Sequence, residues 1–180
     1  MNYINYLVSY EIVDLIKKAT DELGLELTDY SGATFEHIHG LPIDVRNEHK
    51  QLREKLPLIL LFEPKTFDTN IDELSNDYKN GNLILFFLDK GTTTQKLKQT
   101  ELNYDNVIRK LGKVVHQFMS SLQNQKEVTK IEEYKETNWP DFAVNVEQRS
   151  GSNKSETVMY QGLTGKEISF EIKTHKIYNC

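Results

Sequence analysis

Three histidines are the residues of this sequence best suited to metal chemistry. His37 and His39 stand two apart in a segment that alternates like a β-strand, so their side chains would project from one face. His49 is close enough in the sequence to offer a third nitrogen to a zinc or iron ion. Without a nearby cysteine or a fixed third ligand, paired histidines more often pack beside a turn and bond backbone carbonyls. We therefore predict that His37 and His39 are structural and that the chain holds no metal; a metal-dependent enzyme using all three histidines is the alternative.

Two further segments invite a search for catalysis. Gly91-Thr92-Thr93-Thr94 follows an apolar segment, as a phosphate loop would, but the second glycine and the Lys-Ser or Lys-Thr pair are missing. Ser120 and Ser121 fall inside a helical pattern, without the strand-to-helix turn that exposes a nucleophile. We expect no catalytic residue and no bound cofactor.

Composition narrows the class of protein. The 180 residues include 22 Lys and Arg against 27 Asp and Glu, interspersed along the chain, which argues against nucleic acid as a specific ligand. The single cysteine, Cys180, allows no intramolecular disulfide, and this fits a reducing compartment. The beginning of the sequence does not read as a signal peptide, and the most apolar stretch, residues 56–62, is too short to cross a bilayer. We expect no association with a membrane.

The first third of the chain predicts a helix followed by a hairpin. Apolar residues recur at helical spacing over residues 4–23, and Gly24 stands where a left-handed C-terminal cap belongs. Residues 25–27 and 34–39 then alternate like strands on either side of a turn at Ser31-Gly32. A charged stretch, residues 44–55, indicates a loop or a short helix.

The middle of the chain predicts central strands and a long helix. Residues 56–62 and 82–88 are apolar at consecutive positions, which is typical of neighbouring strands covered on both faces. An apolar stripe over residues 102–122 indicates one long helix capped by Thr100, and Gly112 within it suggests close packing on the sheet. We expect the helix and the strands to share one core, made of Leu58, Leu60, Leu83, Leu85, Ile108, Val115 and Phe118.

The last third predicts strands at residues 128–134, 142–146, 158–161 and 168–172. The last of these alternates strictly, so one of its faces should be buried and the other wet, and it should lie at an exposed edge unless something pairs with it. The fold class is α+β: a mixed, mainly antiparallel sheet packed against an N-terminal helix and one long helix. Residues 1–125 are the expected core domain, and residues 126–180 a C-terminal β-strand extension packed on it.

The best interaction candidate is a polar hairpin tip. It contains no apolar residue and consists of Arg149, Ser150, Gly151, Ser152, Asn153, Lys154 and Ser155. Such a tip has no reason to order in a lone monomer, so a partner could order it. Trp139 is either an aromatic anchor at an interface or a residue that closes the rim of the core.

Residues 35–45 (Phe-Glu-His-Ile-His-Gly-Leu-Pro-Ile-Asp-Val), followed by the Leu-Pro-Leu-Ile segment at 56–59, carry a family resemblance. With the order of elements over residues 30–122, they resemble tail terminator proteins of tailed bacteriophages that infect Bacteroidetes-type hosts. The resemblance implies a virion protein, assembled in the host cytoplasm, that forms a ring, typically of six subunits. The ring would cap the tail tube and meet the head connector or stopper. Together with the polar tip and the alternating last strand, the resemblance predicts that the C-terminal strands and the hairpin from Gln148 to Ser155 lie at or near a boundary between subunits. A head–tail stopper or neck adaptor is the neighbouring alternative.

Overall fold

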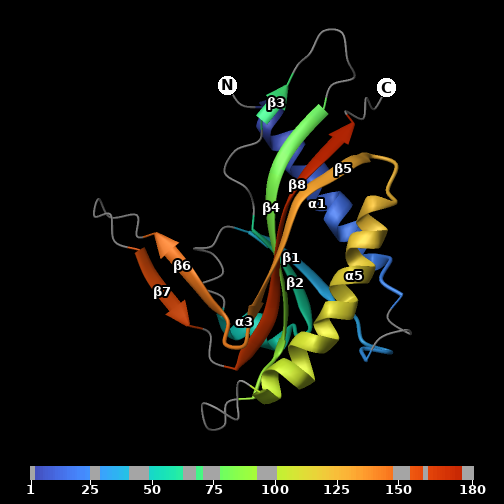
Figure 1. The fold of residues 1–180 in the computed structure, drawn as a ribbon. Coiled ribbons are helices and arrows are strands. Elements are labelled where there is room, and N and C mark those ends of the chain that lie inside the picture. Colours follow the sequence, from blue (N-terminus) through green and yellow to red (C-terminus); the bar gives the residue numbers. More distant parts are fainter. Residues whose placement is uncertain are drawn as a thin grey trace.

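The computed structural model describes residues 3–24, 29–40, 49–62, 68–70, 78–92, 101–147, 155–159 and 162–175. The fold is α+β, with a mixed sheet packed against helices, one of which is long (Figure 1). Its helices are α1 (Tyr3–Asp21), α3 (His49–Glu54) and α5 (Arg109–Gln123), which the π-helical segment η2 (Tyr104–Ile108) precedes. Its strands are β1 (Glu36–Gly40), β2 (Leu58–Phe62), β3 (Asp68–Asn70), β4 (Tyr78–Lys90), β5 (Val128–Trp139), β6 (Ala143–Glu147), β7 (Ser155–Met159) and β8 (Leu163–His175).

The main sheet has the strand order β1-β2-β4-β8-β5, and β3 pairs with one end of β4. The β1–β2 pair is parallel, whereas β2–β4, β4–β8 and β5–β8 are antiparallel. β4 and β8 pair along their whole length, from Tyr78 opposite His175 to Lys90 opposite Leu163. The predicted pairing of the two apolar segments is confirmed, because β2 and β4 are neighbours.

Helix α1 forms because its apolar residues recur on one face, and Ile12, Leu15, Ile16 and Ala19 are buried there. The helix ends through backbone bonds from the nitrogen of Glu22 to Lys18 O (3.0 Å) and from Leu23 N to Thr20 O (3.2 Å). The predicted left-handed cap at Gly24 is wrong, since the positive-φ glycines of the described chain are Gly32 and Gly162. The bond from Leu23 spans three residues rather than four, and this narrower turn ends the helix without a left-handed glycine.

The predicted first hairpin is only partly visible. Its first strand, residues 25–27, lies outside the described residues. The predicted turn is present, with Gly32 at a φ of 78° that favours glycine. The strand after it, β1, pairs in parallel with β2, from Glu36 opposite Leu58 to Gly40 opposite Phe62. The short helix expected within residues 44–55 is α3.

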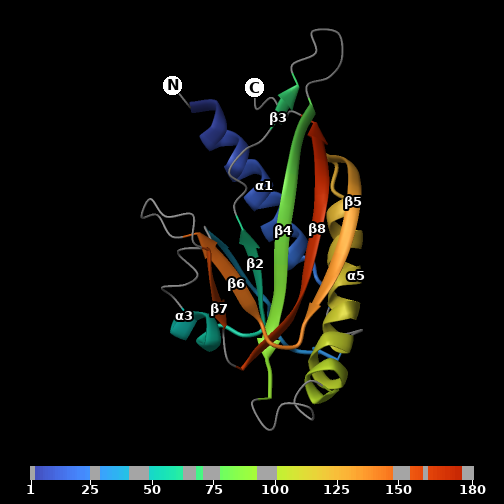
Figure 2. The same cartoon turned by 60° about the vertical axis from the view of Figure 1, so that its left-hand side comes forward.

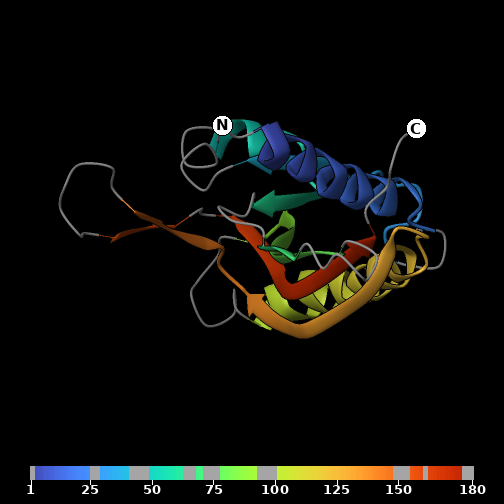
Figure 3. The ribbon, with the colours of Figure 1, turned by 90° about the horizontal axis from the view of Figure 1, so that it is seen from above.

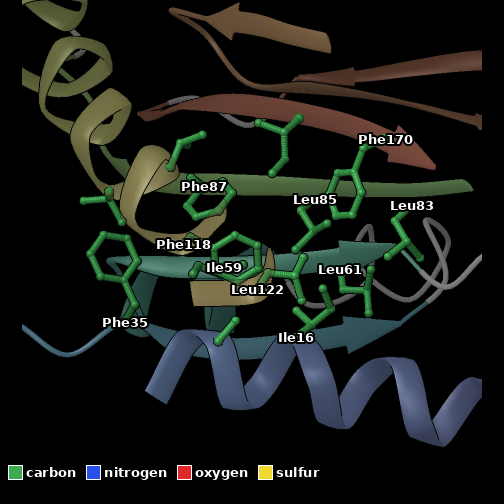
Figure 4. Close-up of a cluster of buried hydrophobic side chains, with 14 of the residues drawn as sticks. Ile16, Phe35, Ile59, Leu61, Leu83, Leu85, Phe87, Phe118, Leu122 and Phe170 are labelled. Atoms are coloured by element: carbon green, nitrogen blue, oxygen red, sulfur yellow. The ribbon is translucent and has the colours of Figure 1, made fainter. Parts of the chain in front are cut away.

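The larger core, here called the helix-side core, lies between the sheet and helices α1 and α5 (Figure 4). Alternate residues of the central strands supply it, among them Ile59, Leu61, Leu83, Leu85 and Phe87. Phe118 of α5 is fully buried, and its ring meets that of Phe87 edge to face, with centroids 5.2 Å apart. Figure 2 shows α5 lying along β5 and β8.

A second core, here called the opposite core, lies on the other face of the sheet. Its buried residues are Leu52, Leu58, Leu60, Phe86, Leu88, Phe142 and Leu163. The prediction of one shared core is therefore wrong for Leu58 and Leu60, because alternation along β2 turns them away from Ile59 and Leu61. Ile108 is buried but belongs to neither cluster.

The long helix occupies residues 101–123 and includes the π-helical segment η2 after its first three residues. Its predicted cap, Thr100, lies outside the described residues. The close packing suggested for Gly112 is wrong, because a Cβ at that position would meet nothing within 4 Å. Close approaches occur instead at Gly91, where a Cβ would collide with the Thr164 side chain, and at Gly165 of β8, where a Cβ would collide with the carbonyl oxygen of Phe87 and with Leu88.

The last strand, β8, alternates as predicted. Ile168, Phe170 and Ile172 are buried, while Glu167, Ser169 and Glu171 between them are partly exposed. The prediction that this strand would be an exposed edge is wrong, because β8 lies between β4 and β5. β5 continues past the predicted end at residue 134 to Trp139 through a bulge in which Glu133 has a φ of 51°. The segment after residue 125 thus supplies two of the five strands in the main path of the sheet.

Candidate functional site

A pair of strands projects from the body and does not belong to the main sheet. β6 and β7 form a two-stranded sheet of their own, from Ala143 opposite Met159 to Glu147 opposite Ser155. Figures 1 and 3 show the strands of this pair, here called the hairpin arm (residues 143–147 and 155–159), standing away from the main sheet. An isolated two-stranded hairpin is marginally stable in water. The arm therefore has the form of an element that gains from packing against another surface.

The base of the arm is fixed firmly to the body. Phe142, directly before β6, is fully buried in the opposite core, and its ring lies edge to face with that of Phe86 at 5.0 Å. Its backbone nitrogen donates to the carbonyl oxygen of Leu163 at 2.9 Å, which joins the two chain segments that enter and leave the arm. The direction of the arm is thus set by core packing.

A buried asparagine adds a second anchor at the same place. Asn103 is 1% exposed, and its Oδ1 accepts a hydrogen bond from the nitrogen of Thr92 at 2.7 Å. Its Nδ2 donates to the carbonyl oxygens of Thr92 (3.3 Å) and Pro140 (3.0 Å), and the hydroxyl of Thr164 donates to the same Pro140 oxygen at 2.7 Å. Three segments distant in sequence are therefore held together where β5 turns into the arm. The sequence does not single out Asn103, because a single asparagine between Leu102 and Tyr104 carries no pattern.

Trp139 lies at the rim of the opposite core. It is partly buried against that core, and its Nε1 donates to Glu167 Oε2 of β8 at 2.8 Å. This is the position expected of a residue that closes the core beneath the last strands. Contact of the same ring with a partner stays a prediction.

The tip of the arm lies mainly outside the described residues. Arg149, Ser150, Gly151, Ser152, Asn153 and Lys154 belong to that segment, and Ser155 is the first residue of β7. The pairing of Glu147 with Ser155 brings the two ends of the segment together, as a hairpin requires. In sequence, the segment carries two positive charges and no acidic residue.

The edge strand β5 is protected over part of its length. Register shifts interrupt its pairing with β8 between Val128 and Lys130 and between Glu132 and Lys135. Glu132 bonds to Lys130 and, at 2.6 Å, to Lys173, and hydrogen bonds from these two lysines lower the pKa of its carboxyl group to about 2. Bulges and charges of this kind discourage pairing with a foreign strand. The β5 edge is thus a weaker candidate for subunit contact than the arm.

Lys166 of β8 is a nearly buried cation next to this edge. Its Nζ donates to Asn138 Oδ1 at 3.0 Å and lies 2.8 Å from Glu136 Oε2, and Glu136 also accepts a bond from the hydroxyl of Tyr134. Burial alone would raise the pKa of Glu136, but the bonds from Lys166 and Tyr134 outweigh it and lower that pKa. Burial, followed by the bond to Glu136, raises the pKa of Tyr134. Each charge has its partner, so the arrangement reads as structural.

The three histidines do not come together as a described site. His37 and His39 lie with their rings 6.0 Å apart and inclined by 26°. His49 begins α3, and its side chain is outside the described set. Over the described ranges, no three histidine, cysteine or acidic side chains are grouped so that they could hold a metal ion.

The other segments considered for catalysis take part in structural contacts. The backbone nitrogen of Gly91 donates to the carbonyl oxygen of Gly162 at 2.9 Å, while Thr93 and Thr94 fall outside the described residues. The hydroxyl of Ser121 donates to Glu22 Oε2 at 2.7 Å, which links α5 to the end of α1. Ser120 is exposed on the helix.

No known protein family matches this chain, and no curated protein sequence matches it. Within the described segments, no helix has the length and apolar character needed to cross a membrane.

Proposed function

We propose that this chain is a structural subunit of a bacteriophage virion that assembles with copies of itself into a closed ring of the tail terminator type. The ring, of about six subunits, caps the tail tube and meets the head connector or stopper protein. The observation that carries the proposal is the hairpin arm, which is anchored at its base by Phe142 and Asn103 and stands away from the sheet.

The order of elements supports this proposal. The resemblance implies an N-terminal helix, a strand with the His-Gly element, a Pro-Leu-Ile central strand, a further strand and a long helix. The chain has α1, β1, β2, β4 and α5 in that order. Pro57 comes directly before β2, and His39-Gly40 closes β1. Fold alone does not specify function, so the proposal depends on the arm as well.

The arm supplies a means of assembly. An arm on one side of a subunit can contact a different surface of the next copy, and such heterologous contacts close into a ring when the rotation between copies allows it. A rigid base matters here, because the angle between neighbours determines how many copies close the ring. Phe142 and Asn103 provide that rigidity.

The test is to remove the polar tip and measure assembly. Deleting residues 149–154 should reduce the population of rings seen by negative-stain electron microscopy and native mass spectrometry, while the circular dichroism spectrum and the melting temperature stay close to those of the intact chain. A matched control deletes residues 71–77, which lie between β3 and β4. That deletion should leave ring formation unchanged.

The outcomes separate the alternatives. If tip deletion leaves ring formation and its concentration dependence unchanged, the arm has no assembly role. If both deletions abolish rings while the subunit stays folded, loss of a loop rather than loss of the arm tip explains the effect, and the proposal fails. Rings that form normally but bind no tail tube would favour the head–tail stopper or neck adaptor.

A further inference from the structure

The paired histidines of β1 lie between the sheet and α1. Ile38 packs on the opposite core, so its neighbours His37 and His39 occupy the face of β1 on which α1 lies. The two rings are 6.0 Å apart and nearly parallel. The charged groups of α1 that act on His37 are Lys17 and Asp21, which form an exposed ion pair with each other at 2.6 Å.

The imidazole of His37 is held in its neutral form. Its Nε2 is buried and has no hydrogen-bond partner. Burial, followed by the charges of His39 and Lys17, lowers the pKa of His37 to about 4, and Asp21 opposes this only in part. Across the sheet, the residue paired with His37 is the apolar Ile59 of β2, which offers no counter-charge. Protonation would therefore place a charged His37 ring beside Lys17, and its buried Nε2 would have no hydrogen-bond acceptor.

We propose that the His37–His39 pair is an acid-sensitive latch that keeps the C-terminal half of α1 closed on β1. When α1 moves away, His37 reaches solvent and binds a proton from water at an ordinary imidazole pKa. Acid thus stabilises the open form, and neutral pH stabilises the closed form. The latch is local, because two other bonds also hold α1. Gln125, in the turn after α5, donates from its Nε2 to Leu15 O at 3.0 Å, and Ser121 of α5 bonds to Glu22.

The size of the effect follows from the two protonation states. His37 has a pKa of about 4 in the closed form and the ordinary value of 6.5 in the open form. Between pH 4 and pH 6.5, the open form therefore binds more protons than the closed form. Stability of the closed form is therefore complete above pH 6.5 and is lost as the pH falls toward 4. Because the His37 ring is partly exposed, solvent weakens the effect of the full pKa difference. We expect the population of the open form to increase about tenfold between pH 7 and pH 5.

Hydrogen exchange measured by mass spectrometry tests this proposal. Protection factors, corrected for the intrinsic pH dependence of exchange, should fall about tenfold in residues 12–21 and 36–40 between pH 7 and pH 5. Protection of residues 111–122 in α5 should change less than about twofold. The variant His37→Phe, which keeps an aromatic ring and removes the titration, should abolish the pH dependence. The control His116→Gln, at an exposed position on α5, should retain it.

Several results would overturn the latch. One is that the protection of α1 in the intact chain at pH 5 is the same as at pH 7. Another is that the His37→Phe variant loses as much protection at pH 5 as the intact chain does. If that variant does not fold, the ring protons of His37 can be titrated by nuclear magnetic resonance in the intact chain. A midpoint below 5 is expected, and any higher midpoint would refute the proposal.

Discussion

Phe118 provides the sharpest test of the packing between the long helix and the sheet. Its side chain is fully buried in the helix-side core, and its ring meets Phe87 edge to face at 5.2 Å. Replacing a fully buried phenylalanine with alanine removes apolar burial and leaves a cavity, which together cost about 3–5 kcal/mol. The aromatic contact places Phe118→Ala in the upper part of this range, because such pairs contribute about 0.5–1.5 kcal/mol beyond their buried area.

Equilibrium unfolding in urea, followed by circular dichroism, measures this loss. The matched control is Ser120→Ala, two residues along the same helix at an exposed position, which should change the free energy of unfolding by less than about 0.5 kcal/mol. A loss below about 1 kcal/mol for Phe118→Ala would mean that this face of α5 does not lie on the sheet.

Three further predictions concern glycines, the arm base and the charged face of β5. Gly112→Ala should stabilise the fold by about 1 kcal/mol, because a Cβ there meets nothing and alanine is the better helix former. Gly165→Ala should destabilise the fold by about 1–3 kcal/mol, because its Cβ would collide with the Phe87 backbone. Urea unfolding should show changes of opposite sign in the free energy of unfolding, and changes of the same sign would contradict the packing. Asn103→Ala should cost about 2–3 kcal/mol, since it removes the bond accepted from Thr92 N and one of the two bonds donated to the Pro140 oxygen, and differential scanning calorimetry should show a lower melting temperature. Lys173→Ala should raise the pKa of Glu132 above about 2, as measured by carboxyl chemical shifts, and an unchanged titration would show that the Lys173 bond is absent in solution.

Periodicity was sufficient to predict the class of fold and the pairing of the two apolar strands. Consecutive apolar residues are buried at 58–61 and 85–88, where the sheet is covered on both faces, whereas Ile84 in the second run is 38% exposed. The same pattern could not assign faces, because a run that is apolar at every position has no alternation to read. Leu58 and Leu60 were therefore placed in the wrong core.

Strand order was harder to predict than strand position. The place of β8 between β4 and β5 depends on pairing over long sequence separations, which local pattern does not encode. The continuation of β5 to Trp139 depends on a bulge at Glu133, and a charged residue with positive φ is not an obvious bulge position.

The arm was partly foreseeable. A polar segment between two short β-like runs predicted a hairpin tip, and β6 and β7 pair on either side of it. The anchors at its base were not, because Asn103 and Phe142 gain their roles from residues that lie far away in sequence. The glycine prediction failed at Gly112 for the same reason, since close approach is a property of the partner element.

The central claim is that copies of this chain assemble into a closed ring. Electron microscopy of the purified full-length chain, with masses from native mass spectrometry on the same sample, tests it most directly. We expect closed rings of one rotational symmetry, with a mass near six times the chain mass of 21.0 kDa. A chain that stays at 21.0 kDa over the whole accessible concentration range, alone and with tail tubes present, would contradict it.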